Sequence, residues 1–133
     1  MLNTFPDLLA FGLFAPFLLR LAVGALLVKA GSKKLKGSAW TNALFERLNR
    51  KPASYYTVAL GIVEVGSGLM LVAGFYTQIA AILSASISAL CWYAKKTYPA
   101  ETPGSRGAFF LMFLISLSLL FSGAGFFAFD RPL

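Results

Sequence analysis

The chain has 133 residues, of which 58% are hydrophobic and only 13% are charged, and its mean hydropathy is +0.73. These values lie beyond the ordinary range of soluble domains and indicate an integral membrane protein. Because there is no histidine and only one cysteine, the sequence excludes an intramolecular disulfide, a CxxC redox pair, His-ligated haem and the usual zinc sites. We expect no metal site, and we read the net charge of +7 as a sign of topology and lipid contact, with no nucleic acid partner.

The first apolar segment, about 8–28, is long enough to cross a bilayer. No Lys or Arg precedes it and it is longer than a signal-peptide core, so we expect it to be retained as a spanning helix. Arg20 lies near its centre, where a charged side chain almost always faces the bundle interior and has a partner. At about 100° per residue, Gly24, Gly31 and Lys34 fall on the same helix face as Arg20.

The first connection, 29–51, is strongly basic. Its apolar residues at helical spacing, Trp40, Leu44, Phe45 and Leu48, predict a short amphipathic helix in the membrane interface. A solvated loop with a few buried apolar side chains is the alternative. We expect anionic lipid or a partner protein to contact the basic residues of this connection, which are Lys33, Lys34, Lys36, Arg47, Arg50 and Lys51.

The next two spans, about 54–75 and 77–94, are separated by so few residues that they form a tight antiparallel hairpin just after Gly74. The first of these two helices is apolar except for Glu64 near its midpoint. Gly61 and Gly68 lie on the same face of the helix as Glu64.

A fourth span, about 107–122, completes the predicted fold, a single domain over residues 1–133. We expect an all-α integral membrane four-helix bundle with a short interfacial helix in the first loop. Ten of the twelve Lys and Arg residues lie in or beside the first and third connections. By the positive-inside rule these two connections are cytoplasmic, and both termini face outward.

Arg20 and Glu64 each lie near the centre of the predicted span, so their depths in the membrane match. A buried charge is costly unless it is paired, and arginine cannot lose its proton. We therefore predict that Glu64 is ionised and held against Arg20. Small residues let membrane helices approach closely, so we expect structural roles for Gly24, Gly31, Gly61, Gly68 and Gly74.

Ser84, Ser88 and Cys91 follow one face of the third span. Such small residues serve tight helix packing, and they also serve a hydrated or ligand-lined cavity, so both readings stay open. Cys91 is interpreted as a small buried apolar residue, since no histidine is present to activate its thiol. The candidate intramembrane site consists of Arg20, Glu64, Ser84 and Ser88.

Taken together, several motifs resemble the DoxX family. They are Arg20 with Gly24, Gly31 and Lys34-Leu35, then Gly61-x-x-Glu64-x-x-x-Gly68, then Gly74-Phe75-x-Thr77, and a tail with Ser122-Gly123-x-Gly125 and Asp130. The tail departs from the family's usual Gly-Pro-Gly by having Ala124. The resemblance implies a small four-helix protein of the bacterial inner membrane, often described as an oxidoreductase or quinol-oxidase-type subunit that works beside a partner.

Three functions stay open at this point, and whether the chain is an enzyme is undecided. The first is an accessory subunit or scaffold of a membrane complex, with the lipid bilayer, another membrane or redox protein, or a second copy as its partners. The alternative is a quinone-interacting oxidoreductase subunit. No electron-carrying cofactor is evident in the sequence, so electrons would pass through bound quinone or another subunit. The third is a small-molecule transporter.

Overall fold

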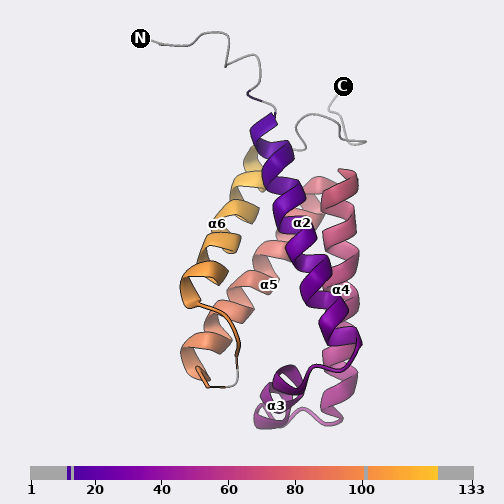
Figure 1. Ribbon diagram of the computed structural model, residues 1–133, viewed down its shortest axis with the longest axis vertical. Helices are drawn as coiled ribbons and strands as arrows, with labels where there is room; N and C mark the ends of the chain where they lie inside the picture. Colours follow the sequence, from indigo (N-terminus) through magenta and orange to yellow (C-terminus); the bar gives the residue numbers. More distant parts are fainter. Residues whose placement is uncertain (1–11, 13, 101, 123–133) are drawn as a thin grey trace.

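The computed structural model describes residue 12, residues 14–100 and residues 102–122, and Figure 1 shows the whole chain. The all-α prediction is confirmed in this part of the chain, where no strand occurs. Three helices, α2, α4 and α5, are long and apolar enough to cross a membrane, and α6 is a shorter apolar helix, as expected of a membrane helical bundle. The helices are α2 (Phe14–Leu35), α3 (Ala39–Arg47), α4 (Ala53–Ala73), α5 (Thr77–Thr97) and α6 (Arg106–Ser122).

Helix α2 continues to Leu35, well past the expected end near residue 28, so the first part of the predicted basic loop is helical. Lys29 and Lys33 do not end the helix because their side chains are exposed on its outer face. Gly31 and Lys34 lie on the buried face. The start of the predicted first span, 8–11 and 13, and the tail residues Gly123, Gly125 and Asp130 lie outside the described residues.

The helices run alternately up and down, and α3 lies across one end of the bundle (Figure 1). The start of α2 and the end of α6 lie at the opposite end. Helix α2 packs most extensively against α4, and α5 packs against α6. The buried core between these pairs includes Leu27, Leu71 and Leu119. We call the two ends of the bundle the α3 end and the far end.

Glycines bring the backbones of α2 and α4 into direct contact. A methyl group placed on Gly31 would lie 2.7 Å from the carbonyl oxygen of Gly61, and one on Gly24 would lie 2.8 Å from that of Gly68. Both distances are far shorter than real carbon contacts, so these positions admit no side chain without separating the helices. The four glycines therefore fix how α2 and α4 are aligned.

Helix α4 ends at Gly74, whose φ of 70° and ψ of 34° lie in the left-handed region that glycine adopts without strain. The N–H of Gly74 donates to the carbonyl oxygen of Leu71 at 3.2 Å, and the N–H of Phe75 donates to that of Met70 at 3.0 Å. This is the usual hydrogen-bonding of a helix C-terminus closed by glycine. It turns the chain back at once, so α5 runs antiparallel to α4.

Candidate functional site

A buried ion pair joins α2 to α4. The ammonium group of Lys34 donates to Oε1 of Glu64, and the two side chains are only 3% and 2% exposed. The prediction that Arg20 is the partner of Glu64 was therefore wrong. The assignment of Lys34 to a surface that faces lipid or a partner was also wrong, because this side chain points into the bundle.

The glycine contacts explain why Arg20 cannot reach Glu64. Gly24 lies against Gly68, and α2 and α4 are antiparallel. Arg20 is one turn beyond this contact in one direction, and Glu64 is one turn beyond it in the other. At about 1.5 Å of rise per residue, roughly 12 Å along the helix axes separates the two residues. Lys34, in contrast, is one turn past Gly31, which packs against Glu64 itself.

The other predicted site residues lie in different places. Arg20 is fully buried toward the far end, with its guanidinium carbon 5.5 Å from the centre of the Phe17 ring. The hydroxyl of Ser84 is hydrogen-bonded to that of Ser116 at 2.7 Å, so it links α5 to α6. Of the four residues in the candidate site, Glu64 and Ser88 line one cavity, and Arg20 and Ser84 are not among its lining residues.

This cavity, which we call the Glu64 cavity, has a volume of about 310 Å³. It lies toward the α3 end, and all five described helices or their connections contribute to its walls. Exposed Leu26, Lys29 and Lys33 of α2 lie at its edge, and Phe109 and Met112 of α6 lie across from them. The cavity is therefore bordered by α2 and α6, two helices that touch far less than α2 and α4 do. Its deeper walls include Lys34, Trp40, Glu64, Ile87, Ser88 and Cys91.

Two buried oxygens of side chains that line the Glu64 cavity have no hydrogen-bond partner among the described residues. They are Oε2 of Glu64 and Oγ of Ser88, and both side chains are 2% exposed. Buried polar atoms nearly always have a partner, so such a pair in one cavity calls for an explanation. Ionised Glu64 accepts hydrogen bonds, the Ser88 hydroxyl both donates and accepts, and the Lys34 ammonium carries two N–H groups beyond the one on Glu64. Hydrogen-bond donors and an acceptor are thus present on side chains that line the cavity.

Trp40 closes the Glu64 cavity at the α3 end, and its ring centre lies 5.4 Å from the Lys34 nitrogen. Its helix is held in place by α4, since the Thr57 hydroxyl donates to Oδ1 of Asn42 at 2.6 Å. Sequence reasoning missed Lys34 and Trp40 as site residues. The signal for Lys34 was present, because it shares the helix face of Arg20. Trp40 gave no such signal, since a tryptophan near a span end is equally expected as an interfacial residue.

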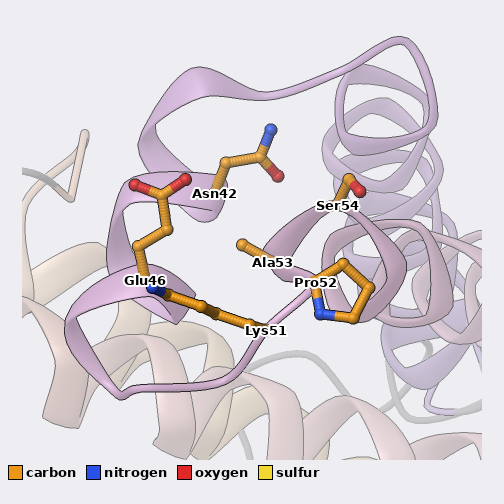
Figure 2. A pocket seen from close by; sticks show the side chains of 6 residues that line it. All are labelled: Asn42, Glu46, Lys51, Pro52, Ala53 and Ser54. Carbon is orange, nitrogen blue, oxygen red and sulfur yellow. The ribbon is translucent and has the colours of Figure 1, made fainter.

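A second, wider hollow of about 810 Å³ lies between α3 and the start of α4 (Figure 2). Asn42 and Glu46 of α3 face the segment of Pro52, Ala53 and Ser54 across it. Glu46, Lys51 and Ser54 are exposed, and Asn42 already accepts a hydrogen bond from Thr57. This hollow is an open part of the surface, and it has none of the buried unpartnered atoms that mark the Glu64 cavity.

The remaining basic residues of the first connection are exposed. Around α3 they form a charged surface, the basic end, which consists of Lys33, Lys36, Arg47, Arg50 and Lys51. Arg47 also lies 6.0 Å from the ring centre of Tyr98, just after α5. The end of α5 and the α3 region therefore meet at the same end of the bundle.

Apolar helices of spanning length, close glycine contacts and a buried ion pair define the chain as a polytopic helical membrane protein. The DoxX family model matches residues 15–96, which is more than half of the sequence. The chain belongs to the DoxX family, as its motifs predicted. Comparison with curated proteins and with solved structures gives no match.

Proposed function

We propose that this chain is an accessory subunit of a membrane complex that binds a small lipid-soluble molecule with carbonyl or hydroxyl groups, of the quinone type, in the Glu64 cavity. The observation that carries the proposal is the pair of buried, unpartnered oxygens on Glu64 and Ser88. Ligand pockets of this kind are mostly apolar, with a few polar groups that fix orientation.

The buried charges of the cavity favour a neutral ligand. Lys34 and Glu64 compensate one another, so a charged head group beside them would leave an excess charge in a dry environment, whereas Lys29 and Lys33 are exposed at the edge of the cavity. A quinone carbonyl can accept from Ser88 or Lys34, and a quinol hydroxyl can donate to Oε2 of Glu64. The residues of the Glu64 cavity can therefore form hydrogen bonds with both the quinone and the quinol. The border with α2 and α6 gives a ligand dissolved in the bilayer a route to these groups.

Trp40 provides a test by fluorescence, because it lines the cavity and the second tryptophan, Trp92, does not. In the Trp92→Phe protein, a quinone without a side chain is expected to quench Trp40 emission saturably. Ser88→Ala should weaken its binding about five- to tenfold, since one hydrogen bond is lost. Ser86→Ala is the matched control, because Ser86 is exposed and, within the described residues, its hydroxyl bonds to the carbonyl oxygen of Ile82 alone. Equal quenching in both variants would refute the proposal.

A scaffold that recruits a partner protein is the second candidate, and the basic end favours it. Five exposed cations at one end of a small bundle make an electrostatic docking surface for an acidic partner. Native mass spectrometry from membranes separates the two functions. A ligand-binding subunit carries a quinone adduct that Ser88→Ala removes, whereas a scaffold carries a protein adduct that Arg50→Glu with Lys51→Glu removes.

We also propose that the chain lies in the bacterial inner membrane with the α3 end in the cytoplasm. Among the described residues every Lys and Arg except Arg20 belongs to the segments 29–51 or 95–106 that meet at this end, which agrees with the positive-inside rule. In a Cys91→Ala protein, a cysteine at Lys36 is expected to resist an impermeant maleimide in intact spheroplasts, and one at Tyr76 to react. The reverse labelling pattern would overturn the orientation.

A further inference from the structure

Another cavity, distinct from the open hollow of Figure 2, lies next to the Glu64 cavity. This one, which we call the α3 cavity, has a volume of about 260 Å³ and lies between α3 and α5. The two cavities share Trp40, Ile87 and Cys91 as lining residues, so these three side chains form the partition between them. The side chains around the α3 cavity include Leu44, Leu48, Leu60 and Ala94.

The two cavities differ in chemistry. The Glu64 cavity contains the ion pair and the unpartnered oxygens, whereas the surface that lines the α3 cavity is apolar. A dry apolar space takes up hydrocarbon, and water gains no partners there. Ligand pockets measure roughly 300–1,000 Å³, a range that the Glu64 cavity reaches only at its lower limit. A larger ligand therefore needs the neighbouring space.

We propose that the ligand is an amphiphile whose polar head lies in the Glu64 cavity and whose alkyl or isoprenoid chain passes the Trp40 partition into the α3 cavity. This inference rests on the proposed function, because it assigns a second part to the same site. Trp40 then contacts the ligand where its head joins its chain. Helix α3, which lies across the end of the bundle, becomes the wall that selects ligands carrying a chain.

The test compares a quinone without a side chain and the same quinone with a decyl chain, both measured by Trp40 quenching in the Trp92→Phe protein. The chain should improve apparent affinity by about tenfold or more, since a few buried methylenes suffice for that. Ala94→Leu fills the α3 cavity and should remove most of this gain without changing the affinity of the chainless quinone. Ala59→Leu, at an exposed position of α4, is the matched control.

Partitioning of the decyl probe into detergent is the same for every variant, so it cancels when the ratio of the two affinities is compared between variants. If Ala94→Leu does not fold, Leu48→Phe replaces it, because Leu48 lines the same cavity yet is 48% exposed. An unchanged ratio in the filled variant overturns the inference while leaving the head-group site intact. If the chainless quinone does not bind at all, the proposed function itself has failed.

Discussion

Gly31→Leu is expected to prevent stable packing of α2 against α4. A β-carbon at this position would lie 2.7 Å from the carbonyl oxygen of Gly61 and 2.9 Å from the β-carbon of Glu64. Neither atom is the end of a flexible side chain, so the helices must separate. Overpacking of a core ordinarily costs about 1–3 kcal/mol, and this case belongs at or above the upper limit because backbone must move.

Gly66→Leu provides the matched control for this prediction. Gly66 is an exposed residue of α4, and a β-carbon there meets no atom within 4 Å. The Gly66→Leu protein should fold normally. Its free energy of unfolding should rise by less than about 1 kcal/mol, because leucine has a better helix propensity than glycine. Circular dichroism during thermal unfolding in detergent measures both variants. If they melted at the same temperature, the glycine contact would have no part in holding α2 to α4.

The hydropathy and helical periodicity of the sequence were enough to predict the all-α membrane fold, and the resemblance of its motifs to the DoxX family was enough to predict the family. They also indicated which glycines to examine, and the structure places Gly24, Gly31, Gly61 and Gly68 at the α2–α4 contact. These features belong to single helices. They are the length of the apolar segment, the helix face on which a residue lies, and the presence on that face of a residue small enough for close packing. Each can be read from local sequence, because no knowledge of the neighbouring helix is needed.

The partner of Glu64 could not be obtained in this way, because it depends on how α2 slides along α4. The prediction matched the centres of two spans and ended the first near residue 28, at the first lysine. Continuation of α2 to Leu35 brings Lys34 into the bundle, and the contact of Gly31 with Gly61 places it beside Glu64. An error of two turns at one helix end was therefore sufficient to select the wrong cation.

The cavities could not be predicted from the sequence, because each is formed by side chains from several helices. Ser84 and Ser88 share one face of α5, yet Ser84 bonds to Ser116 while Ser88 lines the Glu64 cavity. The sequence left tight packing and a hydrated or ligand-lined cavity as alternatives for this serine face. In the structure Ser84 packs against α6, and Ser88, one turn further along, lines a cavity. The difference arises because α6 lies against α5 at Ser84, whereas Ser88 lies where α2 and α6 border the open space.

Removing one partner of the Lys34–Glu64 pair is expected to be strongly destabilising. Lys34→Met leaves a buried carboxylate and Glu64→Met leaves a buried ammonium, each at a cost of about 3 kcal/mol or more. The double variant removes both charges together and should recover much of this loss, because paired apolar residues often replace a buried ion pair without penalty. We therefore expect a coupling energy of about 2 kcal/mol or more, obtained from equilibrium unfolding of the four proteins.

Arg20→Met combined with Glu64→Met is the control cycle, and its two effects should add to within about 0.5 kcal/mol because the residues are well separated. Strong coupling there, and none with Lys34, would restore Arg20 as the partner and refute the register of α2 on α4.

The Lys34→Met/Glu64→Met protein also separates folding from binding. Its unfolding should approach that of the original protein, but it has lost Oε2 of Glu64 and the Lys34 donors. The chainless quinone should then no longer quench Trp40 saturably, which assigns the ion pair to the ligand as well as to the bundle.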